Sequence, residues 1–181
     1  GCSHWRFSSL ADLAGLREAM KNIPGTTFAL EAEEPLLGTL KDLATALGGC
    51  WIELEAKDKV IYHAAAIFAC NYLVTLVKLA TDLWQTLAIP PEPATQALLA
   101  LIRGTINNID TIGIPGCLTG PIARGDNGTI KKHIRALQKV APDLVSTYQE
   151  LGLKTIPIAL KKGRINQKQA SELRAILRPI I

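Results

Sequence analysis

Aromatic residues are scarce, at only 5% of the 181 residues. So few aromatic side chains argue against a surface that stacks bases or sugars. The four cysteines form no C-x-x-C pair, and the three histidines are equally scattered. Because a structural zinc site normally shows paired ligands at short spacing, we expect no metal site. Four cysteines are also too few for a disulfide scaffold, and their isolation favours the reducing environment of the cytoplasm.

The motifs of a complete nucleotide-binding site are missing. The chain has no G-x-G-x-x-G after a strand, no Walker loop and no G-x-S-x-G. One stretch, Val60 to Val77, has the length of a membrane span and no Asp, Glu, Lys or Arg. Because His63, Asn71 and Thr75 interrupt it, we interpret it as a buried helix of a soluble protein and expect no membrane contact.

Charge is unevenly distributed along the chain. Residues 1–55 carry four Lys or Arg against eight Asp or Glu, whereas residues 121–181 carry twelve against four. A basic C-terminal third can meet a phosphate, an anionic substrate or an acidic partner, but it is also typical of a solvated helical surface. Since the whole chain has a net charge of only +4, we expect no nucleic-acid partner. The side chains that would otherwise carry nucleic-acid binding are Lys131, Lys132, Arg135, Lys139, Lys161, Lys162, Arg164 and Lys168.

The pattern of apolar residues predicts a mainly α protein. Residues 26–30 and 50–54 alternate like strands, and residues 33–47 between them show helical spacing, so we expect a parallel strand pair. Two parallel strands are too few for a stable sheet, so the unit is either the edge of a larger sheet or rests on the helices that follow. The helices expected after it span residues 58–87, 93–109, 128–140, 142–162 and 166–177.

The long helix at residues 58–87 carries the first candidate site. His63 and Asn71 stand on an otherwise apolar background of small residues. An imidazole and an amide on one side of a packed helix can hold a polar ligand. The alternative is that both are core residues whose polar atoms are satisfied by backbone groups.

The second candidate site is the loop Leu118–Asp126. Its glycines allow backbone N–H groups to approach a ligand, and Arg124 could clamp a carboxylate or a phosphate. Asp126 would either cap the helix that follows or pair with Arg124. The alternative for the whole segment is an ordinary structured turn between helices.

These stretches resemble a known family. The chain looks like the C-terminal part of Rossmann-like proteins with an appended helical domain of unknown function. These are relatives of pyrroline-5-carboxylate reductase and of NADP-dependent oxidoreductases with a helical domain like that of 6-phosphogluconate dehydrogenase. The resemblance is carried by F-A-L-E at Phe28–Glu31, L-A-T-A-L-G-G at Leu43–Gly49, D-K-V-I-Y-H-A-A-A-I-F-A-C-N-Y-L at Asp58–Leu73, R-G-T at Arg103–Thr105 and L-T-G-P-I-A-R-G-D at Leu118–Asp126.

The resemblance implies an organisation in two parts. Residues 1–55 would be the remnant of a Rossmann-like domain, with its short β-α-β unit. Residues 56–181 would be an all-helical domain like the C-terminal domain of 6-phosphogluconate dehydrogenase. The glycine-rich half that binds the dinucleotide would lie upstream of this chain. A His-Pro segment of the family would match His4, but Trp5 stands in place of the proline.

The resemblance also implies site residues and a reaction. His63 would be the catalytic proton donor, and Asn71, Thr119 and Arg124 would bind substrate. Gly120 and Pro121 would contact the cofactor, NADP or NAD, which the upstream domain would mainly hold. We therefore expect a portion of an NAD(P)-dependent oxidoreductase that binds a small anionic keto or imine substrate, forms a homodimer and is inactive alone. The alternative is a non-catalytic helical module for dimerisation or ligand binding.

Overall fold

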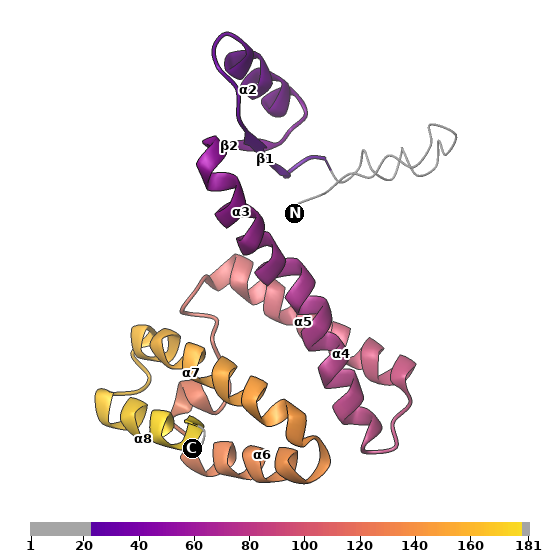
Figure 1. Ribbon diagram of the computed structural model, residues 1–181, viewed down its shortest axis with the longest axis vertical. Helices are drawn as coiled ribbons and strands as arrows, with labels where there is room; N and C mark the ends of the chain where they lie inside the picture. Colours follow the sequence, from indigo (N-terminus) through magenta and orange to yellow (C-terminus); the bar gives the residue numbers. More distant parts are fainter. Residues whose placement is uncertain (1–22, 179–181) are drawn as a thin grey trace. The chain divides into compact units, whose positions relative to one another are not determined.

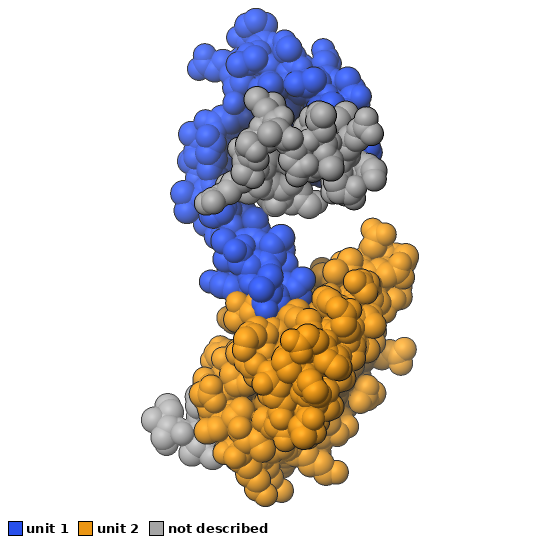
Figure 2. All heavy atoms as spheres, turned by 90° about the vertical axis from the view of Figure 1, so that its right-hand side faces the viewer, with its two compact units in different colours: residues 1–74 blue, residues 75–181 orange. Residues whose placement is uncertain are grey.

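The computed structural model describes residues 23–178. The chain forms two compact units, which divide between Val74 and Thr75 (Figures 1 and 2). His4 and Trp5 lie outside the described residues. The domain boundary expected after residue 55 stays a prediction.

The first unit begins with the expected strand–helix–strand unit. It consists of β1 (Thr27–Leu30), α2 (Leu36–Ala46) and β2 (Cys50–Glu53). The two strands are parallel, with Thr27 opposite Cys50 and Leu30 opposite Glu53, which confirms the predicted pairing. A glycine is needed at position 49, because a Cβ there would stand 2.5 Å from the Phe28 ring and 2.6 Å from the Thr26 carbonyl oxygen. Trp51 and Ile52 of β2 remain 39% and 41% exposed, so both interpretations of the small sheet stay open.

A long helical segment follows. It runs without interruption from Ala56 to Gln85, which confirms the predicted helix. Its start is fixed at Glu55, whose backbone N–H donates to Asp58 Oδ2 at 3.3 Å. The prolines at 90 and 91 follow its end. Along the segment lie η1 (Ala56–Asp58), α3 (Lys59–Ala66), the π-helical turn η2 (Ile67–Asn71) and α4 (Tyr72–Gln85).

The prediction that this segment is buried is wrong for the described chain. It is long and apolar enough to cross a membrane, yet none of its most apolar 18-residue window is buried. Val60, Ile61 and Phe68 are 75%, 73% and 73% exposed. The apolar sequence predicted a helix packed inside the protein, but in the described chain its large apolar side chains are exposed. An exposed apolar surface of this kind is typical of a site that contacts another protein or a membrane.

The second unit contains the core of the protein. α7 (Val145–Lys162) packs against α8 (Gln167–Leu177) and against the short turn η3 (Ile122–Arg124). α6 (Asn127–Val140) packs against both α7 and α8, as the lower part of Figure 1 shows. Ile130, Ile156, Leu173 and Leu177 are its largest fully buried side chains. The predicted helices of this unit are all present. Its remaining elements are α5 (Pro91–Ile112) and the short turn η4 (Pro142–Leu144).

The contact between α7 and α8 depends on a glycine. A Cβ at Gly152 would stand 2.9 Å from both terminal carbons of Leu177 and 3.4 Å from Ile122. We expect Gly152→Ala to lower the free energy of unfolding by about 1–2 kcal/mol, because overpacking outweighs the gain in helix propensity. The matched control is Gly104→Ala in α5, where no atom lies within 4 Å, and we expect it to raise stability by up to about 1 kcal/mol. Thermal unfolding of both variants checks this, and equal stabilisation by the two alanines would contradict it.

Candidate functional site

The loop between α5 and α6 is held by a lysine from α7. Lys162 Nζ donates to the carbonyl oxygens of Gly116 at 2.6 Å and Leu118 at 2.7 Å. An ammonium group that bridges two carbonyls ties the loop to the last turn of α7. Sequence reasoning missed this role, because a lysine in the last turn of a helix is ordinarily solvated or complements the helix dipole.

The end of the loop is fixed by a helix cap. Asp126 Oδ1 accepts from the Thr129 backbone N–H at 3.0 Å, and Oδ2 accepts from the Thr129 hydroxyl at 2.6 Å. Of the two predicted roles of Asp126, the structure shows the helix cap. The hydrogen bonds from the Thr129 hydroxyl and backbone hold the pKa of Asp126 below its usual value.

The cap predicts a pH-dependent stability. Since the pKa of Asp126 is lowered in the folded state, the carboxylate stabilises the fold fully at neutral pH, and this contribution is lost as the pH falls below about 4. We expect Asp126→Ala to lower Tm at neutral pH, with a difference from wild type that shrinks in acid. Asp126→Asn is the matched control, because its amide oxygen can still accept from the Thr129 N–H. A Tm difference that is independent of pH for Asp126→Ala would contradict this account.

A pocket of about 420 Å³ opens beside the loop. It brings together Thr119, Gly120 and Arg124 of the predicted site. Gly120 has a φ of +95°, and no atom lies within 4 Å of the place a Cβ would take. The backbone is therefore open to a ligand at this point. Pro121 does not line the pocket, but its carbonyl oxygen accepts from the N–H groups of Arg124 and Asp126 and so shapes the turn.

The charge of this pocket is positive. Lys162 and Arg164 line it together with Arg124, and no carboxylate is among its described lining residues. Guanidinium groups bind carboxylates and phosphates through paired hydrogen bonds. The loop pocket is therefore suited to a small anion. Sequence reasoning did not assign Arg164 to this site, because it comes from the turn after α7, 40 residues from Arg124.

A second, smaller pocket of about 250 Å³ adjoins the first. The two share Leu118 and Thr119. Thr105 and Asn108 supply polar groups from α5. Its remaining lining side chains are Ile109, Ile114, Cys117 and Ile158. Thr119 thus stands between a cationic compartment and a mostly apolar one, which suits a ligand with an anionic group and a small carbon body.

The comparison with protein families covers this loop and both helices beside it. Residues 26–155 match the family described as Domain of unknown function (DUF2520). The chain belongs to the DUF2520 family. No curated protein and no solved structure matches it.

The other predicted site residues of this DUF2520 chain lie in the first compact unit. His63 belongs to α3, and Asn71 is the last residue of the π-helical turn η2. Both side chains are exposed, so the alternative that they are core residues does not hold within the described chain. π-helical turns are frequent at functional sites, and periodicity alone does not reveal them. Thr119 and Arg124 belong to the second unit, so a site shared by all four residues stays a prediction.

In the described part of the DUF2520 chain, the potential metal ligands and the thiols lie apart from one another. Within residues 23–178, no group of three or more His, Cys, Asp or Glu side chains is placed to hold a metal ion. Cys50, Cys70 and Cys117 are free thiols.

Proposed function

We propose that this chain is the substrate-binding and dimerisation portion of an NAD(P)-dependent oxidoreductase that acts on a small anionic keto or imine substrate. The observation that supports it is the pocket at the α5–α6 loop, where Thr119 stands beside a cluster of Arg124, Lys162 and Arg164. The dinucleotide, NADP or NAD, would be held mainly by a domain upstream of this chain. Alone, the chain would bind substrate without turning it over.

The two adjoining pockets suit such a substrate. A carboxylate would pair with Arg124 and Arg164, while a short carbon body would occupy the smaller pocket beside Cys117 and Ile158. Thr119 would then lie near the middle of the substrate, where its hydroxyl can bond a keto oxygen or an imine nitrogen. Gly120 and Pro121 would face the nicotinamide.

The chemistry would be divided between cofactor and protein. A reduced nicotinamide cofactor, when bound, would supply the hydride for the carbonyl or imine carbon. We propose that His63 supplies the proton to the oxygen or nitrogen, with Asn71 orienting the substrate. We further propose that the protein works in the cytoplasm without membrane or nucleic-acid partners.

The test is a turnover assay with the natural gene product that contains this chain. The assay would measure the oxidation of NADPH, with 2-keto acids and cyclic imino carboxylates as the candidate substrates. Loss of a charge-assisted pair should raise KM about tenfold or more in Arg124→Gln. Lys139→Gln removes an exposed charge from α6 and should leave KM unchanged. No NADPH-dependent turnover with either substrate class, or an unchanged KM in Arg124→Gln, would overturn the proposal.

A second candidate function is a non-catalytic module for dimerisation or ligand binding. It is favoured by the exposed apolar surface of the long helix, where Val60, Ile61, Phe68 and Val74 are each more than 70% exposed. Whether the chain belongs to an oxidoreductase or is a non-catalytic module, we propose that a second copy of the chain covers this surface and forms a homodimer. A dimer that binds small anions but no NADPH, even as the natural gene product, would support the module and exclude the oxidoreductase.

A further inference from the structure

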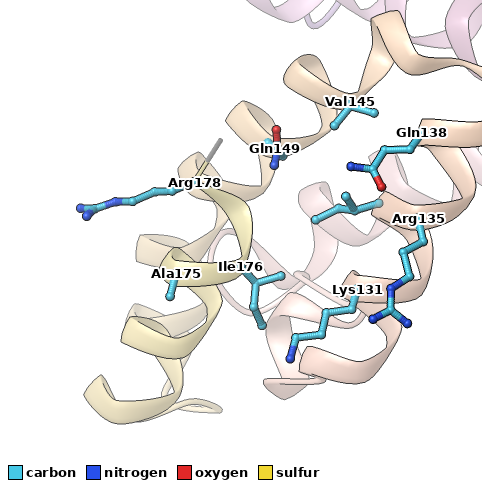
Figure 3. Close-up of a pocket in the computed structure, with 9 residues that line it drawn as sticks. Lys131, Arg135, Gln138, Val145, Gln149, Ala175, Ile176 and Arg178 are labelled. Atoms are coloured by element: carbon cyan, nitrogen blue, oxygen red, sulfur yellow. The ribbon is translucent and has the colours of Figure 1, made fainter. Parts of the chain in front are cut away.

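A second basic pocket lies between α6, α7 and α8, apart from the α5–α6 loop. It has a volume of about 600 Å³, within the range of small-molecule sites. None of its lining residues lines either loop pocket. The lining side chains, most of them labelled in Figure 3, are Lys131, Ile134, Arg135, Gln138, Val145, Gln149, Ala175, Ile176 and Arg178.

The positive charge is concentrated on α6. Lys131 and Arg135 are four residues apart and extend from the same side of the helix (Figure 3). Like charges at this spacing repel each other. Neither forms an ion pair with another residue of the described chain, and no carboxylate is among the pocket's described lining residues. Arg178, at the end of α8, adds a third cation but extends away from the other two.

A buried amide gives the second indication of a ligand. Gln149 of α7 lines the pocket and is only 9% exposed. No hydrogen bond joins its side chain to a described residue. The amide is therefore free to bond a ligand that enters the pocket.

The rest of the lining is apolar. Ile134 and Ile176 pack against the buried core from α6 and α8, and Val145 and Ala175 complete that part of the wall. The pocket therefore offers two cations, a buried amide and a hydrocarbon surface. Such a combination suits an organic molecule with an anionic group at one end and an apolar body.

We propose that this pocket binds a small organic phosphate monoester. The phosphate would lie against Lys131 and Arg135, since a guanidinium and an ammonium match its charge and its acceptor oxygens. The apolar body would lie on Ile134 and Ile176, and a polar group of the ligand would bond the Gln149 amide. This site is independent of the proposed oxidoreductase function, because it shares no residue with the loop pockets.

The test uses the whole 181-residue chain and phenyl phosphate as the probe, with affinity measured by calorimetry. We expect the double variant Lys131→Gln and Arg135→Gln to bind at least about tenfold more weakly. The matched control is Lys132→Gln with Lys139→Gln, which removes two exposed charges from the same helix and should leave the affinity unchanged. Gln149→Leu should weaken binding while preserving Tm, because it removes the ligand's amide partner and keeps a side chain of similar size at this position.

Other outcomes would overturn the proposal. Equal binding by the wild type and the Lys131/Arg135 double variant would show that the phosphate lies elsewhere. Weaker binding in Arg124→Gln would move the probe to the loop pocket. Equal affinity for inorganic phosphate and phenyl phosphate would remove the role of the apolar wall. If an oligonucleotide binds through Lys131 and Arg135 and phenyl phosphate does not, the surface is a nucleic-acid interface instead.

Discussion

Replacing Phe68 with glutamate is expected to abolish the homodimer that we propose for this protein. Phe68 is 73% exposed on a helix whose apolar surface the described chain leaves uncovered. Burial of a phenylalanine side chain contributes about 1.5–3 kcal/mol, and an unpaired buried carboxylate costs more. Because a twofold dimer carries each substitution twice, the dissociation constant should rise more than about 100-fold. Sedimentation of Phe68→Glu and Val60→Glu against the wild type measures this.

The control for this prediction is a glutamate placed elsewhere. Gln96→Glu adds the same charge at an exposed position of α5 and should leave the dimer intact. A membrane is the other surface that could cover the helix, so the wild type should also be tested for flotation with lipid vesicles. A monomeric wild type that floats with vesicles would contradict the dimer.

Removing the Lys162 ammonium should loosen the α5–α6 loop. Lys162→Met keeps the hydrocarbon stem but loses both hydrogen bonds to the carbonyls of Gly116 and Leu118. Charge-assisted hydrogen bonds of this kind contribute about 1.5–3 kcal/mol each, less where water can replace them. We expect a total loss of about 2 kcal/mol in the free energy of unfolding, together with weaker anion binding at Thr119 and Arg124.

Lys161→Met is the matched variant for this experiment. Lys161 is the exposed neighbour of Lys162 in the last turn of α7, and its replacement should change neither stability nor anion binding. Denaturant unfolding and anion titration of both variants provide the comparison. Equal stability of the two variants would show that Lys162 does not organise the loop.

The regular elements could be predicted because their signals are local. Helical spacing of apolar residues, the Pro90–Pro91 stop and the Asp126 cap depend only on residues a few positions apart. The same holds for the strand–helix–strand unit, where turn residues bound two short alternating runs. Thr119, Gly120 and Arg124 could be placed in one pocket because a single short loop carries all three.

The remaining features depend on distant contacts. Lys162 bonds carbonyls 46 and 44 residues earlier in the chain, and no local pattern predicts such a pair. Arg164 was not assigned to the candidate site for a similar reason, because it lies 40 residues from Arg124 in the sequence. The exposure of Val60 and Phe68 was missed for another reason: an apolar helix has the same sequence whether its own chain or another surface covers it. The pocket between α6, α7 and α8 was missed because it joins side chains of three helices, and the sequence shows only their charge.

The most direct test of the proposed function is a titration of the nitrogen-isotope-labelled chain with a small 2-keto acid. The backbone amide signals are monitored by nuclear magnetic resonance during the titration. The account predicts saturable shifts of the amide signals of Thr119, Gly120 and Arg124, with the signals of Thr119 and Gly120 unmoved in Arg124→Gln. Shifts that persist in Arg124→Gln, or a loop that does not respond to the keto acid at any concentration, would contradict the assignment of this pocket as the substrate site.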